Sequence, residues 1–191
     1  MSTITDHLDE LVELIEAKGI QISNDLKPGL TKEEINVRTE VLHFKIPDEL
    51  YELYSWHNGQ DDEGVIPLFR GSYLISLEEA LNDYYTVQTY KEDPEDDFLS
   101  YCFPFAHDEG GIYVLPTSSQ PLYPELTRPV IDIHEGVDVL YTSFINMLVT
   151  INTCFKDGAY IIDPCGKYGP YDQNDALETQ IMKKLNPGLY G

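Results

Sequence analysis

Apolar and acidic residues alternate with the 3.6-residue period of an α-helix at the start of the chain. Gly19 follows the last apolar residue and can adopt the left-handed conformation in which many helices end. The pattern predicts an amphipathic first helix, with a buried stripe made of Ile4, Leu8, Leu11, Val12 and Ile15.

Two further helices are predicted from signals at their N-termini. Thr31 followed by Glu34 is a capping-box pattern and predicts a short helix. We expect Ile35 and Val37 of this helix to face inward. Pro47 predicts the start of a third helix, because its fixed φ suits the first helical turn. This third helix is expected to end at Asn58-Gly59. One face of the helix is expected to carry Leu50, Leu53, Tyr54 and His57.

The pattern then changes to short apolar runs separated by Gly, Pro and acidic residues, which is typical of strands. Ser76 with Glu79 forms another capping box and predicts a helix inserted between these runs. The predicted strands are VIPLF (65–69), YLI (73–75), YCFPFA (101–106) and IYVLP (112–116).

Two successive hairpins follow from residues 103–116, with a turn at 108–111, and from residues 130–141, with a turn at Glu135-Gly136. Thr142 is expected to cap a last core helix that ends near Gly158. Its predicted buried stripe consists of Phe144, Ile145, Leu148, Val149 and Phe155.

The order of elements predicts an α+β fold with a mainly antiparallel sheet flanked by helices. A length of 191 residues fits a single domain. We assign residues 1–158 to this domain and residues 159–191 to a C-terminal extension with a short helix at about 174–185.

Charge restricts the class of partner. The chain has 34 acidic and 12 basic residues, a formal charge of −22, which repels nucleic-acid phosphates and anionic membranes. A macromolecular partner attracted by charge is therefore a basic protein. The alternative is that the acidity only keeps the protein in solution. The fourteen tyrosines suit either a protein interface or the margins of a core.

Three cysteines without paired spacing, together with an N-terminus that lacks the basic start of a secretory signal, favour a reducing, cytoplasmic location. Cys102 and Cys154 lie in apolar segments and are expected to be inert core residues. Cys165 lies in an irregular turn beside Lys167, where its thiol is expected to be more exposed.

The sequence contains none of the nucleotide-binding, hydrolase or zincin motifs. His107 and Glu109 match half of a zinc deaminase signature, but Tyr168 replaces the second cysteine of the other half, so a polar hairpin turn is the favoured interpretation. We expect no metal site and no cofactor. An enzyme that uses Cys165, or a metal at His107 and Glu109, remains the minor alternative.

Four segments in their order resemble the SUKH superfamily, which includes bacterial immunity proteins and relatives of the yeast Smi/Knr cell-wall regulators. The resemblance covers approximately residues 5–158, and the tail departs from the family pattern. The matching segments are KIPDELYELYSWHNG, PLFRGSYLISLEEAL, FPFAHDEGGIYVL and YTSFINMLVTI.

The resemblance implies an α+β binding scaffold without catalysis. Bacterial members neutralise toxins, often nucleases, whereas fungal relatives are associated with β-glucan synthesis. We therefore predict a non-catalytic immunity protein that binds a basic toxin, with a Smi/Knr-type scaffold as the alternative. The predicted contact residues are Trp56, Asp61, Asp62, Glu63, Asp108, Glu109 and Tyr113.

Overall fold

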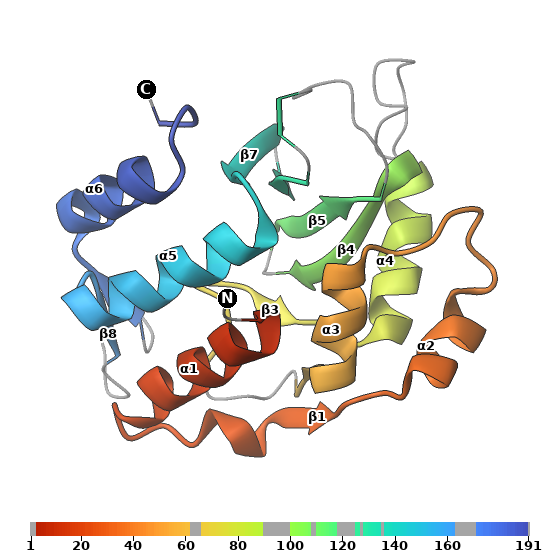
Figure 1. Ribbon diagram of the computed structural model, residues 1–191, viewed down its shortest axis with the longest axis horizontal. Coiled ribbons are helices and arrows are strands. Elements are labelled where there is room, and N and C mark those ends of the chain that lie inside the picture. Colours follow the sequence, from red (N-terminus) through yellow and green to blue (C-terminus); the bar gives the residue numbers. More distant parts are fainter. Residues whose placement is uncertain are drawn as a thin grey trace.

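The computed structural model describes residues 3–61, 66–89, 100–107, 110–117, 125–126, 128–134, 136–162 and 171–190. The fold is α+β, as predicted (Figure 1). Its helices are α1 (Ile4–Glu16), the 3₁₀ helix η1 (Ile22–Asn24), α2 (Lys32–Thr39), α3 (Asp48–Trp56), α4 (Leu77–Thr89), α5 (Phe144–Asp157) and α6 (Asp175–Leu185). Its strands are β1 (Leu26–Pro28), β2 (His57–Gln60), β3 (Tyr73–Leu74), β4 (Cys102–His107), β5 (Ile112–Pro116), β6 (Val130–Ile133), β7 (Val137–Tyr141), β8 (Tyr160–Ile162) and β9 (Tyr171–Gln173).

The main sheet has five strands in the order β3-β4-β5-β6-β7, and every neighbouring pair is antiparallel. Strands that follow one another in the sequence therefore lie side by side, as the two predicted hairpins require. Two small antiparallel pairs, β1-β2 and β8-β9, form separate two-stranded sheets. Neither β1 nor the β8-β9 pair was predicted.

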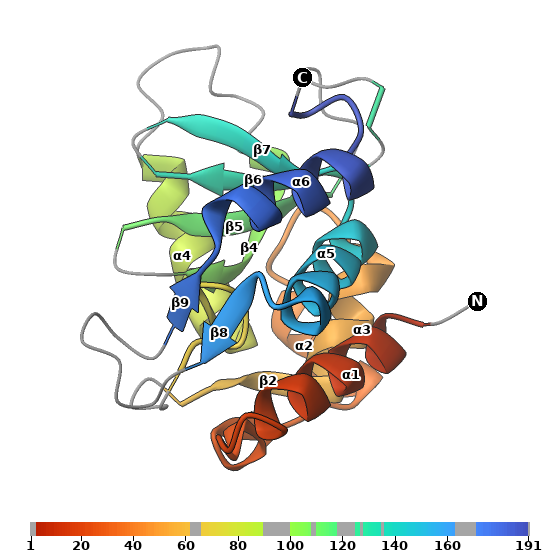
Figure 2. The same ribbon diagram turned by 90° about the vertical axis from the view of Figure 1, so that its left-hand side faces the viewer.

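The core lies between the main sheet and α5, where Phe105 of β4 meets Phe144 edge to face with ring centroids 5.2 Å apart. Helix α1 lies against α5 on the side away from the sheet, as Figures 1 and 2 show. Asn152 of α5 donates to the carbonyl of His7, and Lys156 pairs with Glu10 of α1 at 2.6 Å. The first predicted helix and its buried residues Leu8, Leu11 and Ile15 are confirmed.

Helix α2 begins with the predicted capping box, in which Glu34 N–H donates to Thr31 Oγ1 and Thr31 N–H donates to Glu34. Ile35 is fully buried as predicted, but Val37 is 64% exposed, so its inward placement was wrong. Two residues along a helix turn a side chain by about 200°. Thr39, four residues after Ile35, occupies the inward position instead.

Helix α3 ends two residues earlier than predicted, and the Asn58-Gly59 pair is not its end. His57 to Gln60 form strand β2, which pairs with β1. His57 therefore lies in a strand and not on the helical face, a correction that follows from pairing with a distant segment. Gly59 does adopt a positive φ of 95°, as its role in a tight conformation requires.

The run at 65–69 does not form a strand in its described part, residues 66–69. Phe69 makes only an isolated bridge to Ser72. The side chain of Gln60 donates to the Ile66 carbonyl and accepts from the Leu68 N–H, so it takes the place of a neighbouring strand. The prediction of a strand here was wrong for this reason.

Helix α5 is capped by Ser143, whose hydroxyl accepts from Asn146 N–H, and not by Thr142 as predicted. Ile145 is 40% exposed, so the predicted stripe was wrong at this position. Gly158 ends the helix with a φ of 77°, as expected.

The C-terminal segment packs against the core through buried polar contacts. Helix α6 forms close to its predicted position and lies beside α5 (Figure 2). Asn186, fully buried, accepts from Thr142 N–H and donates to Thr150 Oγ1. Tyr190 donates its hydroxyl to the Leu140 carbonyl in β7. The division of the chain at residue 158 stays a prediction.

A second contact holds α6 to Tyr160 of β8 and to Arg70. Glu178 is buried, accepts from the Tyr160 hydroxyl at 2.7 Å and pairs with Arg70 at 3.1 Å. Burial, first of all, raises the pKa of Tyr160, so its hydroxyl stays protonated and able to donate.

Candidate protein-binding surface

Trp56, the only tryptophan, connects two helices. It is the last residue of α3, and its indole Nε1–H donates to Asp9 of α1 at 2.7 Å. Its ring meets the His57 ring edge to face at 4.4 Å, and the side chain is half-buried. Trp56 therefore packs on one side and offers only part of its surface to a partner.

Asp61 follows β2 directly and is exposed. Its backbone N–H donates to the Asp25 carbonyl at 2.8 Å, which extends the β1-β2 pairing by one residue. The strand separates Asp61 from Trp56, so these two predicted contacts lie at opposite ends of β2. Asp62 and Glu63 lie outside the described residues.

Tyr113 lies in β5 of the main sheet and is 9% exposed. Its ring faces Phe105 with centroids 6.3 Å apart, on the side of the sheet that carries the core. Such burial leaves little of the Tyr113 ring for a partner to contact. Asp108 and Glu109 lie outside the described residues.

A larger feature, not predicted from the sequence, is a groove of about 760 Å³ between α2, α3 and the end of β5. We call it the α2–α3 groove. Lys32 lies 6.0 Å above the centroid of the Tyr51 ring in this groove, and Arg128 pairs with Glu49 beside it. Lys45 adds a third cation. Four separate segments supply the lining, so no local sequence signal marks it.

The described cysteines are poor nucleophiles. Burial raises the pKa of Cys102 to about 12, and burial is also the main cause that raises the pKa of Cys154 to about 11. Both thiols therefore stay protonated near neutral pH. Cys165 lies outside the described residues.

No metal-binding cluster is found in the part of the chain that the structure describes: no three His, Cys, Asp or Glu side chains there come together. His107, from the half signature, has its Nδ1 3.4 Å from a carboxylate oxygen of Asp83 in α4. Among the described helices, none is long and apolar enough to cross a membrane.

The family of this chain is identified by comparison with known protein families. The model of the SMI1/KNR4 family (SUKH-1) matches residues 29–149, which is well over half of the chain. The chain belongs to this family. The resemblance noted in the sequence is therefore confirmed at the level of the family. No curated protein matches the chain.

The SMI1/KNR4 match contains α2, α3, the main sheet and the first part of α5. Helix α1, the end of α5 and helix α6 lie outside it. Both the α2–α3 groove and the exposed side of α2 therefore belong to the family domain. The helices outside the match cover other parts of the core, since α1 and α6 both contact α5.

Proposed function

We propose that this SMI1/KNR4-family chain is a non-catalytic protein-binding domain that captures a basic protein, and that this partner is a toxin. The observation that carries the proposal is the excess of acid. The formal charge is −22, and in the described part of the chain four basic residues are already paired with acids of the chain itself, namely Arg38, Arg70, Arg128 and Lys156.

Such an excess suits a partner that is itself basic because it handles nucleic acid. A nuclease needs positive charge to hold phosphates, and an acidic protein can occupy that surface in place of the substrate. Long-range attraction also raises the rate of association between oppositely charged proteins. The buried, protonated thiols of Cys102 and Cys154 support a role without covalent catalysis.

We propose the exposed Asp61 and the acidic residues near it, Asp62 and Glu63, as contacts that attract the partner. The acidic pair Asp108 and Glu109 and the exposed part of Trp56 complete the set. A cytoplasmic location is part of the proposal, because a toxin that cleaves nucleic acid acts in the cytoplasm and must be bound there.

Co-expression tests the proposal. The toxin gene next to the gene for this chain is induced in cells with and without the chain, and growth and complex formation are measured. We expect growth to be restored and a stable complex to be purified. If no neighbouring toxin is bound or neutralised, the proposed function is wrong.

A scaffold of the Smi/Knr type in cell-wall synthesis is the second candidate, and family membership favours it as well. Gene neighbourhood separates the two, since an immunity gene lies beside a toxin gene. A deletion strain adds a second criterion: increased sensitivity to wall-degrading agents, without any neighbouring toxin, favours the scaffold.

A further inference from the structure

One side of helix α2 faces away from the rest of the molecule. Ile35 and Thr39 are the buried residues of this helix. The opposite side carries residues at i, i+4, i+7 and i+8 spacing, which share one helical face. All are exposed, and we call this set the outward face of α2: Glu33, Val37, Glu40 and Val41.

The two valines are among the most exposed large hydrophobic residues of the described chain, at 64% and 66%. Glu40 has helical backbone angles and Leu42 N–H bonds to Thr39, so the helical turn extends through Val41. Single exposed apolar residues are common on protein surfaces. Six such residues are exposed in the described part of the chain. Four of them, Val37, Val41, Tyr85 and Tyr101, lie on or next to α2, α4 and β4, and these elements contact one another in that order.

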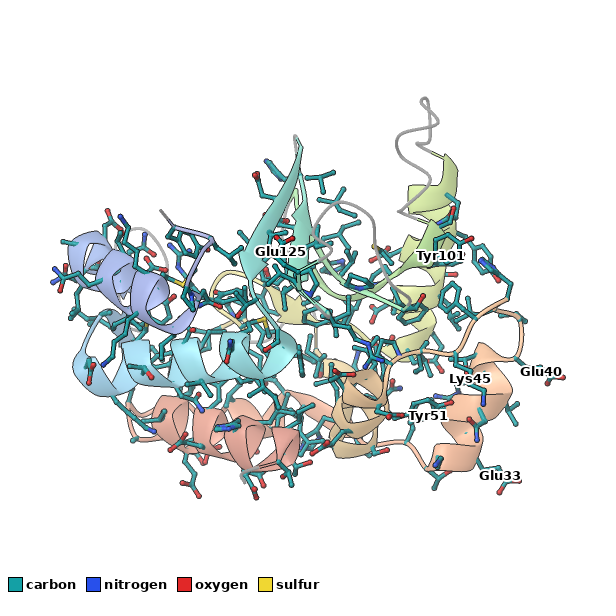
Figure 3. The ribbon with its side chains drawn as sticks, turned by 45° about the horizontal axis from the view of Figure 1, so that its top comes forward. Glu33, Glu40, Lys45, Tyr51, Tyr101 and Glu125 are labelled. Carbon is teal, nitrogen blue, oxygen red and sulfur yellow. The ribbon has the colours of Figure 1, made fainter. Side chains whose placement is uncertain are left out.

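Tyr101 extends the apolar surface beyond α2. It is 41% exposed, and its ring contacts His43 in the segment after α2 with centroids 6.0 Å apart. Figure 3 shows Tyr101, Glu40 and Glu33 on the same side of the molecule, with Glu33 and Glu40 pointing away from the body. Tyr51 and Lys45 lie closer to the body, toward the α2–α3 groove.

Contacts on both flanks hold α2 in place. Arg38 pairs with Glu78 of α4 at 2.8 Å, and the Tyr51 hydroxyl of α3 donates to Asn36. The helix is therefore presented to solvent in a fixed orientation. A surface that is ordered before binding loses less conformational entropy when a partner arrives.

We propose that the outward face of α2, together with Tyr101, is the surface on which the basic partner docks. This inference rests on the proposed function and adds an apolar docking face to the acidic contacts proposed above. The valines and the tyrosine ring bury apolar area, and the two glutamates meet lysine or arginine side chains of the partner. The partner surface that fits is an apolar patch with a basic rim, and neither an acidic protein nor a nucleic acid meets that description.

The test compares matched exposed residues. The toxin domain encoded beside the gene, inactivated at its catalytic residue, is titrated with the full chain. The variants are Val37→Ser, Val41→Ser and Tyr101→Ser, and the controls are Ile145→Ser and Ile161→Ser, whose side chains are also exposed, at 40% and 48%. A circular dichroism spectrum and an unfolding curve for each variant show that it is folded.

We expect each variant on the proposed surface to raise Kd about tenfold or more, with the controls within about twofold of the unaltered chain. Equal effects of the two sets, or no effect of either, would overturn the docking surface while the proposed function stands. Absence of any complex would overturn both.

Sedimentation of the chain alone tests whether a second copy of the chain binds to the outward face of α2. We expect a monomer for the unaltered chain and for the variants. A dimer that dissociates in Val37→Ser and Val41→Ser would show that the face serves self-association, and the proposal would be wrong.

Discussion

Gly59 lies against Ser76 so closely that no side chain fits between them. A Cβ atom on Gly59 would stand 2.7 Å from the backbone nitrogen of Ser76, and the φ of Gly59 is 95°. Ser76 caps α4 by accepting from Glu79 N–H, so it cannot move without loss of that cap. The contact fixes β2 against the start of α4.

Gly59→Ala is therefore expected to be more destabilising than the same change at Gly158. Gly158 also has a positive φ, 77°, but a Cβ there meets no atom within 4 Å. Gly158→Ala should lose about 1–2 kcal/mol of unfolding free energy from backbone strain alone. Gly59→Ala should lose at least ~1 kcal/mol more, because the clash is added. Urea unfolding measures both, and equal losses would contradict the close packing at Gly59.

The two glycines also show how far the sequence predicts this fold. Gly158 ends α5 through contacts with residues close to it in the sequence, and this role was predicted. The positive φ of Gly59 was expected too, but as the end of a helix, because the strand that pairs with β2 lies about 30 residues away and carries no local signal. The two predicted capping boxes, whose partners are three residues apart, are confirmed, although the capping box of Thr3 with Asp6 was not predicted.

The exposure of the candidate contact residues was harder to predict from the sequence, for the same reason. Exposure depends on which face of an element the rest of the chain covers. The sequence around Tyr113 does not show which face of its strand is buried. In α2 the outward spacing of Glu33, Val37 and Val41 is visible in the sequence. Only the burial of Ile35 shows that this spacing marks the exposed side.

Asn186→Ala tests the packing of the C-terminal segment. The change leaves the Thr142 N–H without its acceptor in a partly buried site and removes the buried contact to Thr150, which together cost about 1–3 kcal/mol of unfolding free energy. Asn82→Ala, at an exposed position of α4, is the control and should change stability by less than about 0.5 kcal/mol. Similar small losses for the two variants would show that Asn186 does not anchor the segment.

The Glu10–Lys156 pair between α1 and α5 predicts a pH-dependent contribution to stability. The hydrogen bond from Lys156 lowers the pKa of Glu10 below its ordinary value of 4.5, with a further contribution from Asn152. A lowered folded pKa stabilises the protein above pH 4.5, and this contribution is lost as pH falls through the folded pKa. Because both side chains are well exposed, the pair contributes only about 0.2–1 kcal/mol.

Unfolding of Glu10→Gln should therefore show a loss of unfolding free energy at pH 7 that is smaller at about pH 3, below the ordinary pKa of the carboxyl. Glu13→Gln, exposed on the same helix, serves as the control and should show a smaller difference. A loss for Glu10→Gln that is unchanged between the two pH values would exclude the ion pair as its cause.

Thiol reactivity tests the burial of Cys102 and Cys154. In a Cys165→Ser background, both thiols should react with a disulfide reagent at pH 8 about 100-fold more slowly in the folded protein than in urea, because their raised pKa values suppress the thiolate. A folded-state rate close to the unfolded rate would show that at least one thiol is accessible and ionised.

The central claim is that an acidic member of this family captures a basic protein through charge. The most direct measurement is the association rate constant with the neighbouring toxin domain between about 50 and about 500 mM salt. We expect the rate constant to fall at least tenfold over this range, with a much smaller change in the dissociation rate constant. An association rate constant that does not depend on salt would contradict the claim.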